Sequence, residues 1–497
     1  MNEHKKQMNK LILIVMVYLA GFAPKANAHQ YVVSDVNAFN ETMSKVQAGD
    51  EIVWKNGSYS DIQLKFRPNE NGTETQPILL KAETAGKVSF TGSSQICIGG
   101  SYLLVEGLLF EGKCTLDSKQ NVIDFSTVAD KSATASNHCK VSNCAIVNYS
   151  PTEESGKENY YVNLVGTNNE LDHCYFTGKV NKGPTVVVEY KQDKAYVPGS
   201  DVAQSTAHHI HHNYFGYRTY SANGGEQLRV GTSTTSFTHG FNMVEYNYFE
   251  DERLEAEVIS NKSCDNIYRF NTFVGNDGAM VIRHGHKCFV YGNYINGKTG
   301  RNQSGGLRVI NPDNTIFNNY VEEAEGGAKG MKAPIAVMSG LEGSPLNGYY
   351  PADNAIVAYN TVVNCVGSAI NIGVGNTTKG LSLVAPKNVL LVGNVVLYTK
   401  GKDESSLKIE GSSTYTLRSN FSNSGGTSLK GFGGIASNDF RIKDGFSYVK
   451  QTADHAVVDS INERLSLHKI KLTEREITWF NPKWKLSKND VGVSWIK

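Results

Sequence analysis

Hydrophobic and polar positions alternate over short distances through most of this 497-residue chain. Between about residues 50 and 435, apolar runs such as EIVW, ILLKA and YLLVEGLLFEG are separated by glycine, asparagine and charged residues, and no segment shows helical periodicity. Glycine is frequent (48 residues), proline is rare (12), and there are 25 tyrosines, a composition that favours strands and tight turns. We therefore predict an almost entirely β structure for this region.

One short helix is predicted ahead of the β region. Apolar residues at helical spacing follow Ser34-Asp35, a pair suited to a helix N-cap, and Gly49 ends the pattern. These apolar residues are Val36, Phe39, Met43 and Val46. A single amphipathic helix at this place suits a cap over the exposed end of a stack of strands.

Asparagine followed by an aromatic or β-branched residue recurs through the β region. The repeat asparagines are Asn213, Asn247, Asn271, Asn293, Asn319, Asn360 and Asn394. Their spacings of 34, 24, 22, 26, 41 and 34 residues are typical of a coiled β solenoid with insertions in its outer loops. HCYF, with Cys174 in the asparagine position, and SNCA at Asn143 match the repeat more loosely.

A stack of turns explains why asparagine recurs. Rungs of a stack lie about 4.8 Å apart, so aligned amides can hydrogen-bond along it, and asparagine tolerates the left-handed conformation that corners need. A propeller would need a repeat of about 40–50 residues, and a sandwich of this length would be unusual as one domain. We predict a single-domain, all-β, right-handed parallel β-helix over residues 29–435. Residues 436–497, with a helix near 453–467, should form a C-terminal cap of the same domain.

The first 28 residues have the pattern of an export signal. A basic region precedes an apolar run at residues 11–23, and Ala26-Asn27-Ala28 offers a cleavage site. The apolar run is shorter than the roughly 20 residues of a membrane anchor. We expect an exported protein, periplasmic or secreted, without a membrane anchor.

Charge and cysteine content exclude some classes of function. Lys and Arg number 49 against 48 Asp and Glu, so no charge excess favours nucleic acid or an anionic membrane as partner. The eight cysteines are scattered and most lie in apolar strand-like runs. We interpret them as buried thiols, although a disulfide framework is the alternative that an exported protein permits.

Two acids and an arginine form the core of a candidate site. Counted from the preceding repeat asparagine, Glu255 and Glu257 fall at offsets 8 and 10, Arg283 at 12, and Asn223 at 10. Even offsets lie on one face of a strand, so these side chains should form one outward-facing patch, with Asn223 stacked over Glu257. The residues between them should point into the core, namely Ala256, Val258, Met280 and Ile282.

The same count extends the patch to neighbouring rungs. Lys262 and Arg308 share offset 15, and Glu226 and His284 share offset 13. The patch would then span about four rungs, or roughly 15 Å. That length accommodates a few sugar residues.

The residue types in this patch point to one chemistry. Two carboxylates and an amide carbonyl make a hard, oxygen-only site suited to Ca²⁺, although two solvated surface acids are an equally ordinary outcome. A metal would neutralise the carboxylate of a polyuronate and stabilise the enolate that forms when the adjacent proton is removed. Lys262, with its pKa lowered by Ca²⁺ and Arg283, would be the base, and Arg283 would stabilise charge or assist proton delivery. The predicted reaction is β-elimination.

A histidine-rich run, HHIHH at residues 208–212, is a candidate zinc site. Alternation places His208 and His212 on one face with Ile210, and His209 and His211 on the other. Without cysteine or acid partners at ligand spacing, we interpret these side chains as corner or surface histidines.

Three segments resemble the signature segments of polysaccharide lyase family six, which contains alginate lyases and chondroitinase B. They are SANGGEQLRVG (221–231), LEAEVISNKS (254–263) and MVIRHGHKCFVYGN (280–293). The resemblance implies that Asn223, Glu255 and Glu257 are calcium ligands, that Lys262 is the Brønsted base and that Arg283 is the Brønsted acid. It places Glu226, His284 and Arg308 near the substrate.

Three functions remain open at this stage. KVNKGPTVVVEYK (179–191) resembles alginate-active members of the family, so we expect a monomeric alginate lyase acting on mannuronate-containing polymer. A dermatan sulfate lyase of the chondroitinase B type is the alternative, and a non-catalytic carbohydrate-binding β-helix is the third reading. Tyr349 and Tyr350, in a long insertion, would either stack on sugar rings or pack on the solenoid.

Overall fold

A computed structural model describes residues 28–125, 135–190, 205–220, 224–298, 303–375, 382–399, 405–423, 432–435 and 439–496. The expected signal peptide lies outside these ranges except for its last residue, and so does Asn223. None of the helices in the described ranges is long and apolar enough to span a membrane.

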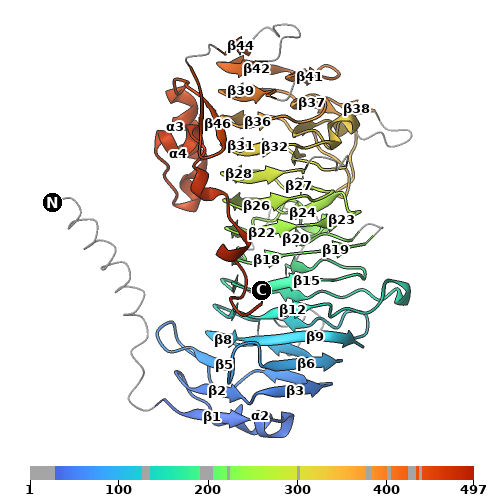
Figure 1. Ribbon diagram of the computed structural model, residues 1–497, viewed down its shortest axis with the longest axis vertical. Coiled ribbons are helices and arrows are strands. Elements are labelled where there is room, and N and C mark those ends of the chain that lie inside the picture. The colour runs from blue at the N-terminus through green and yellow to red at the C-terminus, as the bar shows by residue number, and fades with distance from the viewer. Residues whose placement is uncertain are drawn as a thin grey trace, which may run out of the picture.

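The chain coils into a right-handed parallel β-helix, as predicted, with three long parallel sheets that run the length of the molecule (Figure 1). Each turn passes through sheet A, then sheet B, then sheet C, and each strand pairs with the strand one turn away. The 14 strands of sheet A are β1 (Gln30–Val33), β2 (Glu51–Trp54), β5 (Ile78–Ala82), β8 (Leu103–Glu106), β11 (Lys140–Ser142), β14 (Glu170–Asp172), β17 (His209–His211), β21 (Met243–Glu245), β25 (Ile267–Arg269), β28 (Phe289–Tyr291), β31 (Thr315–Phe317), β35 (Ile356–Ala358), β39 (Val389–Val392) and β42 (Tyr415–Arg418).

Sheets B and C complete each turn. The 14 strands of sheet B are β3 (Gly57–Ser60), β6 (Val88–Gly92), β9 (Leu108–Cys114), β12 (Ala145–Val147), β15 (Tyr175–Thr177), β18 (Tyr214–Phe215), β22 (Tyr248–Glu250), β26 (Thr272–Val274), β29 (Tyr294–Asn296), β32 (Tyr320–Glu322), β36 (Thr361–Val363), β40 (Val395–Leu397), β43 (Asn420–Ser422) and β44 (Phe432–Gly434). The 12 strands of sheet C are β4 (Gln63–Phe66), β7 (Gln95–Ile98), β10 (Ile123–Asp124), β13 (Val162–Leu164), β16 (Val186–Val188), β20 (Leu228–Gly231), β24 (Glu257–Lys262), β27 (Ala279–His284), β30 (Leu307–Val309), β33 (Ile335–Met338), β37 (Ile370–Val374) and β41 (Leu407–Ile409).

Short elements lie outside the three sheets. The paired strands are β19 (Arg218–Thr219) with β23 (Glu252–Arg253), β34 (Gly340–Leu341) with β38 (Leu383–Val384), and β45 (Phe440–Lys443) with β46 (Phe446–Val449). The α-helices are α2 (Val36–Thr42), α3 (His455–Leu465) and α4 (Glu474–Thr478). The 3-10 helices are η1 (Glu153–Ser155), η2 (Ser233–Thr235), η3 (Gly326–Lys329), η5 (Ser466–His468), η6 (Pro482–Trp484) and η7 (Lys488–Asp490).

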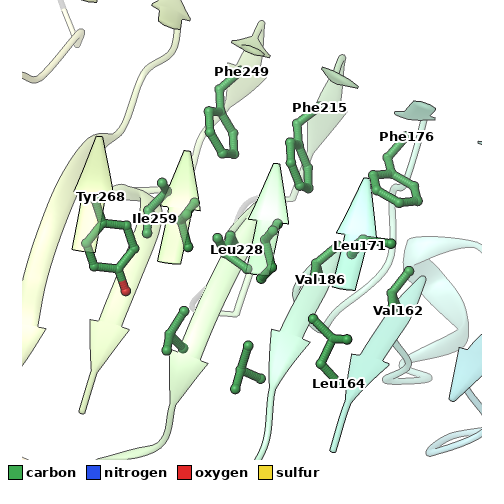
Figure 2. Packing of buried hydrophobic residues seen from close by; sticks show 14 of the residues in the cluster. Val162, Leu164, Leu171, Phe176, Val186, Phe215, Leu228, Phe249, Ile259 and Tyr268 are labelled. Carbon is green, nitrogen blue, oxygen red and sulfur yellow. The ribbon is translucent and has the colours of Figure 1, made fainter. Parts of the chain in front are cut away.

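The core is a set of apolar columns parallel to the axis of the solenoid. Phe176, Phe215 and Phe249, from successive turns of sheet B, lie in one column beside aliphatic residues of sheets A and C (Figure 2). The ring centroids are 5.4 Å apart for the first pair and 4.6 Å for the second. The alternation read from the sequence therefore produces a continuous interior, since each strand adds an inward residue to the same columns.

The repeat asparagines form a buried ladder at the corner between sheets A and B. Each side-chain amide donates to the amide oxygen of the next asparagine along the stack at 2.9–3.1 Å, from Asn213 to Asn420. Cys174 occupies the asparagine position in its turn, as predicted, and its backbone N–H donates to Asn213 Oδ1. The ladder role inferred for these residues is confirmed.

Two details of the ladder differ from the prediction. The left-handed residue at each corner is the one before the ladder asparagine, for example Tyr246 and Phe270, rather than the asparagine itself. Asn143 is such a corner residue, with φ of 52°, so Cys144 holds the ladder position in SNCA. The asparagines recur because of their amides, since the corner conformation belongs to their neighbours.

Asn293→Ala should lower the free energy of unfolding by about 3 kcal/mol, because it leaves several buried polar groups unpaired. Asn293 Oδ1 accepts two hydrogen bonds from Asn271, and its Nδ2 donates to Asn319 Oδ1 and to two backbone carbonyls. Asn69→Ala, which removes an exposed amide, is the control and should change stability by about 0.5 kcal/mol or less. Equal losses in denaturant titrations of the two variants would show that the ladder does not stabilise the stack.

The first and the last of the described residues pack against the solenoid. Asp35 caps α2 by accepting the N–H of Ala38, and Phe39 of α2 is fully buried in the core. The helix ends at Thr42, one turn earlier than the apolar spacing suggested. At the other end, α3 packs its apolar face on sheet A, and the last residues run back along the side of the stack until Trp495 Nε1 donates to Asn143 Oδ1 (Figure 1).

No disulfide joins the eight cysteines, all of which lie in described ranges. Six of them are buried, and Cys97 and Cys114 are partly exposed. The interpretation as small apolar core residues is confirmed for these six cysteines.

Candidate active site

The predicted site residues that the structure describes gather on the outer side of sheet C. Glu257 and Lys262 are the first and last residues of β24, Arg283 and His284 end β27, and Arg308 is central in β30. These three strands are neighbours in sheet C, next to β20. Adjacent turns of the solenoid therefore bring the residues together, as the offset count proposed.

The register differs in detail from that count. Lys262 pairs with Gly231 and His284, whereas Arg308 pairs with Val281, which itself pairs with Ser260. Arg308 is thus two positions from the row of Lys262, and Glu226 is not in the row of His284. The count was wrong because the segments between the ladder and sheet C differ in length from turn to turn.

Two irregularities in the pairing of β24 with β27 shape the site. The register shifts between Glu257 and Ile259, so that Val258 and Ile259 both enter the core. It shifts again after Asn261, and Arg283 falls between two paired residues of its strand. Bulges re-aim side chains in this way next to functional sites. Met280 and Ile282 point into the core as predicted, but Ala256, in the preceding loop, remains partly exposed.

Three carboxylates meet at one end of the site. Glu255 is buried in the loop before β24, where its oxygens accept the backbone N–H groups of Gly225 at 2.9 Å and Ala256 at 2.7 Å. Burial raises the pKa of Glu255, and the negative charges of Glu226 and Glu257 raise it further. Glu226 is 2% exposed, and its Oε2 has no hydrogen-bond partner among the described atoms.

This end of the site fits a divalent cation. It offers only hard oxygen donors, the acids repel one another, and one buried carboxylate oxygen is unpartnered, all of which a bound Ca²⁺ would relieve. Asn223, the third expected ligand, lies outside the described residues, two positions before Gly225. Glu257 already accepts Arg308 Nη2 at 2.6 Å and the hydroxyl of Ser260.

Lys262 lies at the other end of strand β24 from Glu257, and its side chain approaches Glu226. Its ammonium is 4.0 Å from Glu226 Oε1, and its side chain is 17% exposed. Burial is the largest cause that lowers the pKa of Lys262. The nearby guanidinium groups of Arg229 and Arg283 lower that pKa further, while the acids raise it. The site therefore favours a neutral lysine more than water does.

Arg283 is held by a loop from much later in the chain. Its guanidinium donates to the carbonyls of Gly348 and Asn347 at 3.0 and 3.2 Å, and lies 4.2 Å from the ring centre of Tyr349. Its Nε is 3.9 Å from Glu257 Oε1. Tyr350 packs edge-on against Phe237. Of the two tyrosines, Tyr349 is the one beside the site.

The family model of Chondroitinase B matches residues 33–463 of this chain. This chain belongs to the chondroitinase B family. Its members include enzymes solved under the name of polysaccharide lyase family six, and the fold and the signature segments agree with that assignment. No curated protein matches the chain.

Solved structures of this lyase family are similar over most of the chain. The alginate lyase AlyGC is 31% identical, with a TM-score of 0.78 over 94% of this chain. This chain spans 59% of the length of AlyGC. A mannuronic acid specific family-six lyase from human gut microbiota is 26% identical, with a TM-score of 0.71 over 94% of this chain and 97% of that one.

His284 is fully buried beside Lys262 and Arg283. Its Nε2 is 3.4 Å from the hydroxyl of Ser233. Burial lowers the pKa of His284 to about 2, helped by the charges of Arg283 and Lys262. The imidazole is therefore neutral, and it contributes hydrogen bonding and shape without charge.

Two supporting residues of this family member escaped the sequence reasoning. Arg218 is 1% exposed and donates to the carbonyls of Gly225 and Gly183, thereby fixing the backbone at Gly225, whose N–H donates to Glu255. Glu252 is fully buried and accepts the N–H groups of Glu255 and Gly278. Burial raises the pKa of Glu252 to about 8. Both residues lie in the short paired strands β19 and β23, outside the three long sheets, where no periodic pattern marks them.

Proposed function

We propose that this protein is an exported alginate lyase that cleaves mannuronate-containing polymer by Ca²⁺-assisted β-elimination. The observation that carries the proposal is Lys262, a partly buried lysine with a lowered pKa, placed near Arg283 and the three acids. The similarity to AlyGC and to the mannuronic acid specific enzyme supports alginate as the substrate.

Each residue has a role that its surroundings support. Neutral Lys262 removes the proton from the carbon next to the uronate carboxylate, and the electrons of that bond form the new double bond as the bond to the leaving oxygen breaks. Arg283 donates hydrogen bonds to the developing charge and to the leaving oxygen, which takes up a proton from water. The guanidinium groups of Arg283 and Arg308 supply positive charge that favours a polyanionic substrate. Ca²⁺ bound by Asn223, Glu255 and Glu257 would neutralise the substrate carboxylate and stabilise its enolate.

A panel of polyuronates tests the proposal. Alginate enriched in mannuronate, alginate enriched in guluronate, dermatan sulfate and chondroitin sulfate are each incubated with purified protein, and the absorbance of the unsaturated uronate is followed. We expect the largest rate on mannuronate-rich alginate. A higher rate on dermatan sulfate would contradict the proposal and show that the protein is a dermatan sulfate lyase of the chondroitinase B type. Retention on immobilised alginate without any cleavage would favour a binding protein.

Export is tested separately. Expressed in a Gram-negative host, the protein should appear in the periplasm or the medium with an N-terminus at His29. A full-length chain retained in the cytoplasm would contradict the proposed signal peptide at residues 1–28.

Arg218→Met should lower kcat about 10-fold or more, because the backbone that holds Glu255 loses its anchor. Arg218→Lys, which keeps a cation in the same cavity, should recover part of the rate. Circular dichroism and thermal unfolding verify that both variants fold. If kcat stays at the wild-type value in a folded Arg218→Met variant, Arg218 does not position the site.

A further inference from the structure

The histidines of the HHIHH run meet acids on the outer face of sheet A, away from sheet C. One ligand atom from each of Glu170, His209 and His211 lies within 4.8 Å of the others. Glu170 pairs with His209 across β14 and β17, and Ile210 between the histidines is fully buried, so the three polar side chains face outward. We propose that these residues bind a divalent transition metal of the Zn²⁺ class, at a site separate from the lyase centre.

The donor types and their spacing suit such an ion. His211 Nε2 and Glu170 Oε1 are 2.8 Å apart, and the ring centroids of His209 and His211 are 4.0 Å apart. Ligands about 2.0–2.1 Å from a tetrahedral Zn²⁺ lie roughly 3.3 Å from one another. To admit the ion, His211 Nε2 and Glu170 Oε1 would separate by about half an ångström, and the His209 ring, whose ligand atom lies within 4.8 Å of both, would turn to the same spacing. Imidazole and carboxylate are ordinary zinc ligands, and a water would complete the coordination.

A second layer of contacts orients the ligands. His209 Nε2 is 2.8 Å from Glu245 Oε1, and Glu245 is fixed in turn by Arg269. His211 Nδ1 is 2.8 Å from His212 Nδ1, so one ring nitrogen of His211 is oriented while the other faces Glu170. Metal-bound histidines usually have such partners for their second nitrogen. The sequence reading missed these acids because they come from the preceding and following turns.

The charge around the cluster favours a cation. Glu170, Asp172 and Glu245 supply three negative charges, whereas Lys140 and Arg269 supply two positive charges, so neutral imidazoles leave one negative charge in excess. Lys140 bonds both Glu170 at 2.9 Å and Asp172 at 3.0 Å, and it keeps Asp172 when Glu170 turns to a metal.

A metal ion bound to these three residues would cross-link two consecutive turns of the solenoid. Glu170 belongs to one turn and both histidines to the next, so an ion bound only by the folded stack would raise its free energy of unfolding by an amount that grows with the logarithm of the ion concentration. The side chains of His209 and Glu170 are 40% and 34% exposed, which gives the ion access from solvent.

Zn²⁺ titration of the chelator-treated full chain tests the proposal. We expect one Zn²⁺ per chain with micromolar or tighter affinity by calorimetry, and a melting temperature that rises by several degrees with Zn²⁺. Co²⁺ in place of Zn²⁺ should give the visible absorption of a tetrahedral site with nitrogen and oxygen ligands.

Variants separate this site from other histidines and from the lyase centre. His209→Gln with His211→Gln should lose the bound Zn²⁺ and the Zn²⁺-dependent rise in melting temperature. His138→Gln, at an exposed position in another turn, and Glu255→Gln in the lyase site should retain both. Absence of stoichiometric binding, or unchanged Zn²⁺ affinity in the folded double variant, would show that the cluster is only a hydrogen-bonded ladder. If the double variant does not fold, the Co²⁺ spectrum of the wild-type chain decides, since a spectrum without tetrahedral bands overturns the proposal.

Discussion

Lys262→Met should reduce kcat on alginate by about 10²–10⁴-fold, the usual contribution of a general base. Methionine nearly preserves the volume and the apolar stem of the lysine, and only the ammonium group is lost. The side chain lies between Glu226 and the guanidinium groups of Arg229 and Arg283, where the neutral amine is favoured relative to water. Steady-state kinetics on the preferred polymer measure the loss.

The pH dependence of the wild-type rate is an independent test of Lys262 as the base. Because only the neutral amine accepts a proton, the rate should rise with pH through the pKa of Lys262 and then level off. Since that pKa is lowered, the rise should occur below the ordinary lysine value of about 10.4. A rate that falls over the same range would contradict a lysine base.

Lys408→Met is the matched control for Lys262→Met. Lys408 also lies on sheet C, in β41, but its side chain is 56% exposed and it pairs with Glu410. We expect this variant to retain the wild-type kcat. A similar loss in both variants would mean that the effect of Lys262→Met comes from the fold or from overall charge.

Glu255→Gln should abolish the response to Ca²⁺ and most of the activity. Changes to groups that merely support a metal site weaken binding about 10–100-fold, so the loss of a charged ligand should cost ~100-fold or more. The backbone N–H groups of Gly225 and Ala256 each donate to one oxygen of the carboxylate. In the glutamine, an NH₂ group would face one of these N–H donors in place of an oxygen, and that hydrogen bond would be lost. Calcium titration of the chelated protein, followed by calorimetry and by rate, measures both effects.

Glu463→Gln serves as the control for the loss of one negative charge. Glu463 is an exposed residue of α3, on the other side of the solenoid from sheet C. This variant should bind Ca²⁺ and turn over substrate like the wild-type enzyme. If Glu255→Gln keeps the Ca²⁺ affinity of the wild type, Glu255 is not a ligand and supports the site only through its backbone contacts.

The repetitive parts of the fold follow directly from the amino-acid sequence. A parallel stack repeats the same environment every turn, so the amides of Asn247, Asn271 and Asn293 mark the corner in the sequence as they do in space. The same regularity predicts the inward columns, including Met280 and Ile282, and the burial of most cysteines. The candidate site could be collected from sequence because its members sit near the same place in consecutive turns.

The irregular parts depended on the tertiary structure. The bulges around Glu257 and Arg283 change the register by single residues, and no periodic count shows where a strand gains one. Contacts between residues far apart in the sequence cannot be predicted from a periodic pattern either. The carbonyls of Asn347 and Gly348 reach Arg283 from more than 60 residues away, and Arg218 fixes a loop through backbone carbonyls that any residue could provide.

By itself the sequence determined the β-helix, the ladder at its corner and the residue types of the candidate site, because stacking forces similar side chains into register. Only the tertiary structure decided which side chains touch. It removed Arg308 from the row of Lys262, buried Glu226 and His284, and brought Glu170 to the outward histidines. Those outcomes depend on loop lengths and on neighbours from other turns, which a single strand's pattern does not contain.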